Sequence, residues 1–108
     1  MNLAWAAGFF DGEGCICLAR RFRKGKKHPE YELKLSVGQA NPKPLELFSK
    51  SFGGNVNKRG DGYYICKLSS RDSIETLRIL IPFLVLKKDE AIEALKFGGL
   101  MIGRRKYH

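Results

Sequence analysis

Apolar and polar residues follow two different spacings along this chain, and the spacings divide it into helices and strands. The first residues have small and aromatic side chains at helical spacing, which predicts a helix that ends near Asp11 and Glu13. Residues 15–23 then alternate between apolar and polar side chains, and residues 31–38 do the same. A basic turn joins these two segments, which together predict a long hairpin with one apolar face.

Three more helices and a second hairpin follow. Pro42 opens a helix that Gly53 ends, and Ser69 or Ser70 caps the next helix. The predicted elements are a helix of residues 42–52, strands of residues 55–59 and 63–68, a helix of about residues 70–80 and a last helix of about residues 87–97. The order α-β-β-α-β-β-α-α predicts an α+β fold with a four-stranded antiparallel sheet and helices on one face. We expect a single domain of residues 1–97 and a basic tail of residues 98–108.

The charge of the chain indicates a polyanionic partner. Among 108 residues, 20 are Lys or Arg and 11 are Asp or Glu, for a formal net charge of +9. This excess favours nucleic acid, with an anionic membrane surface as the competing interpretation. The longest apolar run, residues 79–86, is too short to span a bilayer. Without a signal-peptide pattern, an intracellular location is expected, and three cysteines without a CxxC pair disfavour zinc.

The sheet face opposite the helices is the predicted DNA cradle. Charged residues on such a face are often only solvated, but the positive bias and the basic hairpin tips favour binding to double-stranded DNA. The candidate DNA-binding residues are Cys17, Ala19, Arg21, Arg23, Lys26, Lys27, Glu32, Lys34, Ser36, Asn57, Arg59, Tyr63, Ile65 and Lys67.

The segment Ala6-Ala7-Gly8-Phe9-Phe10-Asp11-Gly12-Glu13-Gly14 carries the candidate chemistry. A stripe of small residues lets another helix backbone approach closely. Acids at a helix C-terminus face its partial negative charge, so two such helices packed together call for metal ions between their acids. A plain N-terminal helix with a glycine cap is the alternative interpretation. The predicted interface between two copies consists of Ala4, Ala7, Gly8 and Asp11.

This segment resembles the signature of the LAGLIDADG homing endonucleases, and the topology resembles a whole single-motif subunit of that family. Against the signature, the small pair is Ala7-Gly8, the apolar pair is Phe9-Phe10, the first acid is Asp11 and the metal-binding acid is Glu13. The chain departs from the usual pattern in having Ala6 for Leu and Glu13 for the commoner Asp.

The resemblance implies an active site and a reaction. Glu13 and the backbone of Gly12 correspond to metal ligands, and the implied catalytic residues are Glu13, Gln39, Lys43 and Lys87. Lys88 is the alternative to Lys87 if the register slips by one residue. Each residue also has a plain structural interpretation, for example Gln39 as a strand-end cap and Lys43 as a surface residue. The implied cofactor is Mg²⁺ or Mn²⁺, with Ca²⁺ supporting binding only.

The implied function is homing endonuclease activity of the kind that mobilises introns or inteins. The resemblance implies a homodimer that makes a double-strand cut in a long, pseudo-palindromic DNA site. No association with a membrane is expected. The first alternative is a non-cleaving nucleic-acid-binding protein of the same fold, such as an RNA splicing maturase or a regulator. A basic structural or membrane-surface protein is the second, and it leaves the glycine and acid motif unexplained.

Overall fold

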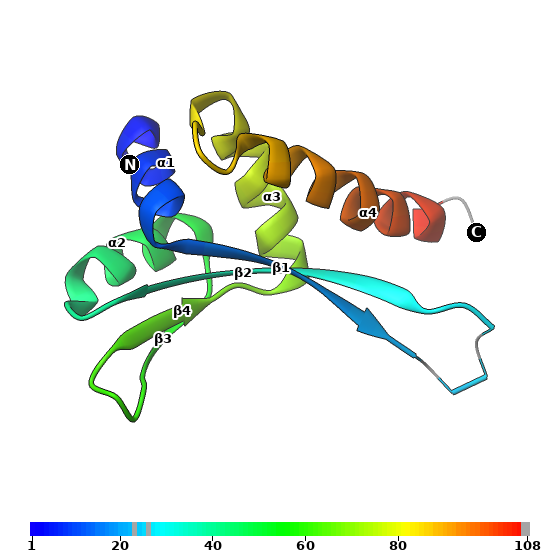
Figure 1. The fold of residues 1–108 in the computed structure, drawn as a ribbon, viewed down its shortest axis with the longest axis horizontal. Helices are drawn as coiled ribbons and strands as arrows, with labels where there is room; N and C mark the ends of the chain where they lie inside the picture. Colours follow the sequence, from blue (N-terminus) through cyan, green and yellow to red (C-terminus); the bar gives the residue numbers. More distant parts are fainter. Residues whose placement is uncertain (23, 26, 107–108) are drawn as a thin grey trace.

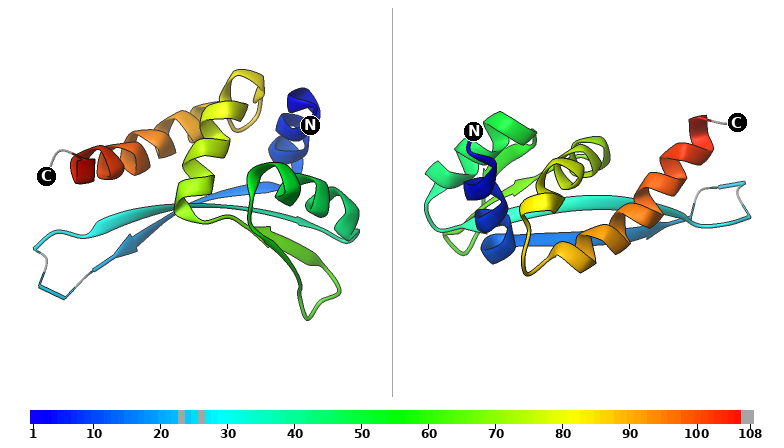
Figure 2. Two further views of the ribbon diagram at one scale, coloured as in Figure 1. Left: turned by 180° about the vertical axis from the view of Figure 1, so that it is seen from behind. Right: turned by 90° about the horizontal axis from the view of Figure 1, so that it is seen from above.

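Four strands form one antiparallel sheet, and the helices lie on one of its faces (Figure 1; Figure 2). This computed structural model describes residues 1–22, 24–25 and 27–106, except for the side chains of Arg21 and residues 98–106. The elements are α1 (Leu3–Glu13), β1 (Gly14–Arg21), β2 (Glu30–Gln39), α2 (Pro42–Phe52), β3 (Asn55–Lys58), β4 (Tyr64–Lys67), α3 (Ser70–Leu80), the 3-10 helix η1 (Ile81–Phe83) and α4 (Lys88–Lys106).

The strand order is β1-β2-β4-β3, and every neighbouring pair is antiparallel. The β1–β2 hairpin is long, whereas β3 and β4 have four residues each. Both hairpins bend away from the helices toward their turns, so the open face of the sheet is concave (Figure 1). This arrangement confirms the predicted α+β fold.

Side chains cap the first turns of α1, α2 and α3. The Asn2 side chain accepts a hydrogen bond from the Trp5 backbone N–H at 3.0 Å, which satisfies one free donor of α1. Asn41 and Ser69 cap α2 and α3 in the same way. α2 ends at Gly53, whose φ of 97° lies in the left-handed region that favours glycine.

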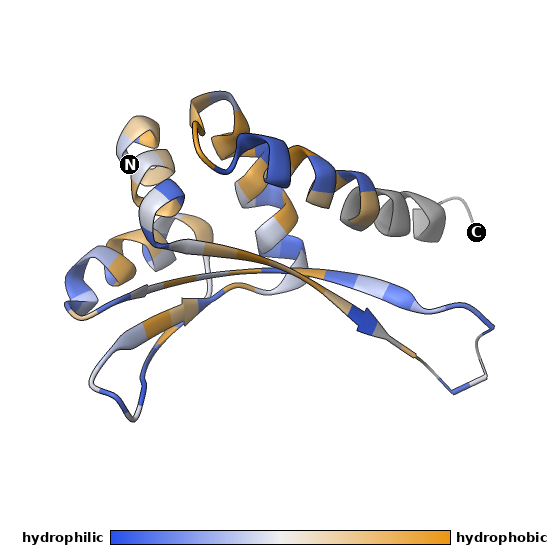
Figure 3. Ribbon diagram, in the orientation of Figure 1, coloured by the Kyte–Doolittle hydropathy of each residue, from blue (hydrophilic) through white to orange (hydrophobic). Residues whose placement is uncertain are grey.

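The core lies between the sheet and the helices, and β2 runs through its middle. Leu33, Leu35 and Val37 of β2 are buried on one strand face, as their alternation predicts. Above them, the rings of Phe10 and Phe48 stack with centroids 6.3 Å apart. Figure 3 shows that the hairpin turns, by contrast, are hydrophilic. Among the described helices, none combines the length and apolar character that a membrane span requires.

The last helix is longer than the sequence pattern predicted. The prediction that it ends near Phe97 is wrong, because α4 continues to Lys106. Two glycines follow Phe97 and each costs about 1 kcal/mol relative to alanine, but residues 100–102 are Leu, Met and Ile and no proline intervenes. The division of the chain into a domain and a tail at residue 97 stays a prediction.

Candidate active site

The end of α1 presents Glu13 to solvent. The backbone N–H of Gly14 donates to the Phe10 carbonyl and closes the helix, after which β1 begins at once. A Cβ at Gly14 would clash with the Phe10 ring and carbonyl, so only glycine fits this junction. The Glu13 side chain is exposed, and within the described part of the chain it makes no hydrogen bond or ion pair. A rigid turn therefore holds an open carboxylate at the edge of the sheet.

Asp11, two residues earlier, is bound within its own subunit. Its carboxylate oxygens accept hydrogen bonds from the backbone N–H groups of Val85 at 2.7 Å and Lys87 at 2.9 Å. Burial acts to raise the pKa of the Asp11 carboxyl, but these backbone hydrogen bonds, a further one from Leu86 and the Lys87 charge hold that pKa below its ordinary value. Asp11 thus ties the end of α1 to the segment before α4.

Lys87 is the lysine that the fold brings to this place. Its ammonium donates to the backbone carbonyl of Asp11, and its own carbonyl accepts from Ala91 in the first turn of α4. Lys88 is exposed as the first residue of α4. Of the two lysines considered from the sequence, Lys87 makes the contact with the helix that carries Glu13.

Gln39 lies at the same end of the sheet as Glu13. In the register of β1 and β2, Gly14 pairs with Val37, and Gln39 is two residues further along β2. The Gln39 side-chain oxygen accepts from the Ala40 backbone N–H at 2.8 Å, which matches its interpretation as a strand-end cap. Its role beside a metal stays a prediction.

Lys43 follows on the first turn of α2. Its backbone N–H donates to the capping Asn41 side chain at 3.0 Å, and its side chain is exposed. Lys43 therefore projects from the helix that starts directly after the end of β2. The fold brings Lys87 into contact with the end of α1 and sets Gln39 and Lys43 along one segment near that end.

One face of α1 is open and glycine-rich. Gly8 and Gly12 are exposed, and a Cβ built on either glycine meets nothing within 4 Å. Ala4 is exposed as well, but the expectation that Ala7 belongs to the same open stripe is wrong, because Ala7 is completely buried. The open face of α1 therefore consists of Ala4, Gly8 and Gly12, and Ala7 packs into the core of its own subunit.

Two exposed apolar residues beside this face were not predicted from the sequence. Val85 is 84% exposed and Leu86 is 79% exposed, although both belong to the apolar run of residues 79–86. Their backbones lie against Asp11, so they flank the end of α1. The signal was the proline within that run, since Pro82 lies in η1, where the regular helical spacing of α3 ends.

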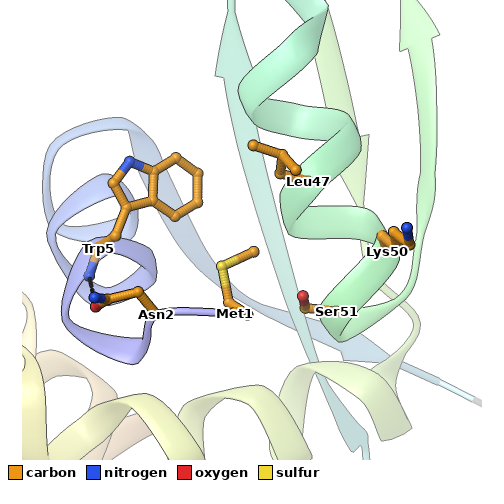
Figure 4. Close-up of a pocket in the computed structure, with 6 residues that line it drawn as sticks. All are labelled: Met1, Asn2, Trp5, Leu47, Lys50 and Ser51. Atoms are coloured by element: carbon orange, nitrogen blue, oxygen red, sulfur yellow. Dashed lines mark hydrogen bonds between the residues drawn. The ribbon is translucent and has the colours of Figure 1, made fainter.

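A shallow pocket lies between α1 and α2 (Figure 4). Its apolar lining comes from Trp5 and Leu47, which are 40% and 54% exposed, together with Met1. In α2, Leu45 and Phe48 face the core, whereas Leu47 faces solvent. Trp5 stacks on Phe9 with ring centroids 5.2 Å apart, so the indole is held at the pocket edge.

The concave sheet face carries the predicted DNA-binding residues that the structure describes. Register places Cys15, Ser36, Lys67 and Asn55 in one row across all four strands, on the face opposite the buried Cys66. Alternation puts the other strand residues of the prediction on this face too: Cys17, Ala19, Glu32, Lys34, Asn57 and Ile65. Lys27, Arg59 and Tyr63 are exposed near the hairpin turns, whereas Arg23, Lys26 and the side chain of Arg21 lie outside the described residues.

Some charges on this face are paired. Lys34 lies 3.5 Å from the Glu32 carboxylate, which also accepts a hydrogen bond from the Ser70 hydroxyl at 3.1 Å. At the other hairpin, Arg59 and Asp61 form an ion pair at 3.2 Å. Both pairs are partly exposed, so they orient side chains more than they stabilise the fold.

Within the described residues, no three His, Cys, Asp or Glu side chains converge as a metal-ligand cluster. The oxygen donors at the end of α1 are the Glu13 carboxylate and the backbone carbonyl of Gly12. Oxygen donors suit hard cations such as Mg²⁺, but one carboxylate is few for such an ion. A complete site needs ligands from elsewhere.

Comparison with known proteins agrees with this geometry. Residues 6–88 match the LAGLIDADG endonuclease family. The DNA endonuclease I-CvuI of Chlorella vulgaris is 33% identical over 97 residues, which cover 84% of this chain and 60% of that protein. The chain thus spans less than two thirds of the length of this curated relative.

Solved structures show the same fold. I-CvuI in complex with its target in the presence of 2 mM Ca superposes with a TM-score of 0.79 at 30% identity, over 95% of this chain and 69% of the other. I-CvuI has also been solved on the I-CreI target with 2 mM Mg, with the DNA not cleaved, at a TM-score of 0.74 and 32% identity over 87% of this chain and 63% of the other. The archaeal intron-encoded I-Vdi141I with DNA has a TM-score of 0.79 at 17% identity, over 98% and 72% of the two chains. The chain belongs to the LAGLIDADG endonuclease family.

Proposed function

We propose that this chain is one subunit of a homodimeric, metal-dependent DNA endonuclease that makes a double-strand cut in a long, pseudo-palindromic site. The observation that carries the proposal is the open face of α1, which ends at the exposed Glu13. Among the described residues, none lies close enough to require glycine at positions 8 and 12, whereas close approach of a second helix does.

Self-association through α1 explains several features together. A two-fold axis beside Gly8 brings two copies of Glu13 to one seam. The exposed Val85 and Leu86 flank the same helix and supply apolar surface that a partner subunit covers. The dimer therefore brings two Glu13 carboxylates to the seam, whereas one chain by itself supplies only one.

The residues at that seam fit a hard divalent cation. The paired Glu13 carboxylates and Gly12 carbonyls would hold it. These groups are oxygen donors, which such an ion prefers, and both residues are exposed. When bound, a divalent cation lowers the pKa of attached water and offsets charge on the phosphate.

The remaining residues act on the substrate around this seam. The Lys87 ammonium neutralises charge that develops on the scissile phosphate. Lys43 holds a neighbouring phosphate through the ammonium of its exposed side chain. Gln39 orients the attacking water through its side-chain amide.

The concave sheet face supplies DNA affinity. Lys34 and Lys67 project from it, and the whole chain carries a net charge of +9. Contacts to phosphates release counterions, so affinity should fall steeply as salt is raised. A flat salt dependence between 50 and 200 mM, a range over which about six to ten phosphate contacts cost 10³–10⁵ in affinity, would contradict this part of the proposal.

A selection experiment tests the proposal and identifies the cleaved sequence in the same step. The protein is incubated with Mg²⁺ and a library of randomised duplexes, the cut ends are sequenced, and the selected site becomes the substrate for all variants. Cleavage of one pseudo-palindromic sequence is expected, and it should require Glu13. Gel shifts in Ca²⁺ measure binding separately. Binding without any cleavage would instead favour the non-cleaving maturase or regulator.

A further inference from the structure

Asp11 and Lys87 lie 76 residues apart in sequence, and their contacts form a reciprocal cap between α1 and α4. The Asp11 carboxylate accepts backbone N–H groups from Val85 and Lys87, just before α4 starts. In return, the Lys87 ammonium donates to the Asp11 carbonyl in the last turn of α1. Each side chain thus serves the terminus of the other helix.

This exchange explains two charges that are unfavourable within their own helices. An acid in the last turn of α1 faces the negative end of its own helix, and a lysine before α4 faces the positive end of its own. Across the pair both signs become favourable, because Asp11 meets free N–H groups and Lys87 meets a free carbonyl. The same contacts restrict a long lysine side chain that would otherwise occupy many rotamers.

We propose that Asp11 is a positioning residue, which holds the Lys87 ammonium at the end of α1, two residues from Glu13. This inference rests on the proposed endonuclease function. An ammonium has three donors, so its bond to the Asp11 carbonyl leaves two for a DNA phosphate. Because both Asp11 carboxylate oxygens are already bound to backbone N–H groups, Asp11 supports Lys87 instead of binding a metal.

A double-mutant cycle tests the inference on the selected DNA site. Asp11→Asn and Lys87→Met should each slow single-turnover cleavage by about 10- to 100-fold, a range typical of losing a group that supports a metal site from outside its ligands. If Asp11 acts through Lys87, the double variant is no slower than Lys87→Met. Losses that multiply would overturn the inference. The DNA Kd in Ca²⁺ should change less than the rate, and Asp89→Asn and Lys96→Met serve as charge-matched controls on α4.

A second measurement does not depend on cleavage. Trace acetylation followed by mass spectrometry reports how available each lysine is, and Lys88 provides an internal reference. Lys87 should react more slowly than Lys88 in the natural protein and several-fold faster in Asp11→Asn. An unchanged Lys87 rate would also overturn the inference. Where circular dichroism shows that Asp11→Asn does not fold, Asp11→Glu, which keeps the charge but shifts the carboxylate, replaces it in both measurements.

The two tests separate the failure of this inference from the failure of the proposed function. If the natural protein cuts no DNA, the endonuclease proposal fails, while acetylation still reports on the Asp11 and Lys87 contact. If the natural protein cuts DNA but the cycle is multiplicative, the endonuclease proposal stands and Asp11 has a purely structural role.

Discussion

The two faces of α1 differ in what they contact. The inner face, with Ala6, Ala7 and Phe10, is completely buried by its own subunit. The outer face, with Gly8 and Gly12, contacts nothing within reach of an added Cβ. Small residues occur on both faces, so residue size by itself does not distinguish packing inside a subunit from packing between subunits. The inner face stabilises the fold, and the outer face leads to Glu13.

The largest effect should come from Glu13 at the end of the outer face. Glu13→Gln keeps the shape but removes the charge that holds a cation, so cleavage of the selected site should fall by roughly 1,000-fold or more. Thermal unfolding should be unchanged, and DNA affinity in Ca²⁺ should hold or rise. The exposed Glu93→Gln on α4 is the control. Normal cleavage by Glu13→Gln would remove the outer face from the mechanism.

The inner face should respond through stability instead. Phe10→Ala removes a fully buried ring that stacks on Phe48, and comparable losses cost about 3–5 kcal/mol of unfolding free energy. Urea unfolding followed by circular dichroism measures this loss. A cost below about 1 kcal/mol would show that the two faces of α1 are less different than their burial indicates.

Substitution of Gly8 on the outer face should disrupt assembly, and cleavage with it, while the fold of the subunit stays intact. Gly8→Leu places a large side chain where the subunit has open space, so the fold tolerates it and helix propensity improves by up to about 1 kcal/mol. The dimer should dissociate, because the two helices can no longer approach. Sedimentation equilibrium measures this change, with Lys96→Leu as a control at an exposed position away from the face. A Gly8→Leu protein that remains a dimer contradicts the proposed interface.

The smallest effect concerns Asp11, which lies between the two faces. Its pKa is lower in the folded protein than the ordinary value of 3.8, so its contribution to stability is present above that value and is lost as pH falls through the folded pKa. The difference in unfolding free energy between the natural protein and Asp11→Asn should therefore shrink below pH 3.8. Urea unfolding at several pH values measures it. A difference in unfolding free energy that stays constant with pH would show that Asp11 stabilises the fold through the shape of its side chain and not through its charge.

The fold could be predicted from the sequence because its signals are local. The alternation of Leu33, Leu35 and Val37 defines one strand face, and Asn41 and Ser69 act as caps within three residues of the donors they satisfy. The small residues and the acids of residues 6–14 predicted a helix that ends in carboxylates, and the resemblance to the LAGLIDADG signature identified Glu13 as the candidate metal ligand among them.

Some burial and contacts could not be predicted, because they depend on tertiary structure that local sequence patterns do not contain. α1 carries small or apolar residues on every side, so helical spacing could not decide that Ala7 is buried while Gly8 is open. Val85 and Leu86 follow a 3-10 turn, where the helical period no longer applies. The partner of Asp11 is 76 residues away, and no spacing rule identifies it.

The reciprocal cap also limits how this chain can be recombined with its relatives. α1 and residues 85–87 satisfy each other's free backbone groups, so together they form one transferable unit. A chimaera that takes α1 from one protein and the segment before α4 from another should lose these hydrogen bonds, unless the first parent has aspartate at the position of Asp11 and the second has lysine at the position of Lys87. A single crossover anywhere between α1 and residue 85, the hairpin turns included, separates the two parts of this unit. Hybrid subunits are therefore better built with two crossovers inside that stretch, so that α1 and residues 85–87 come from the same parent.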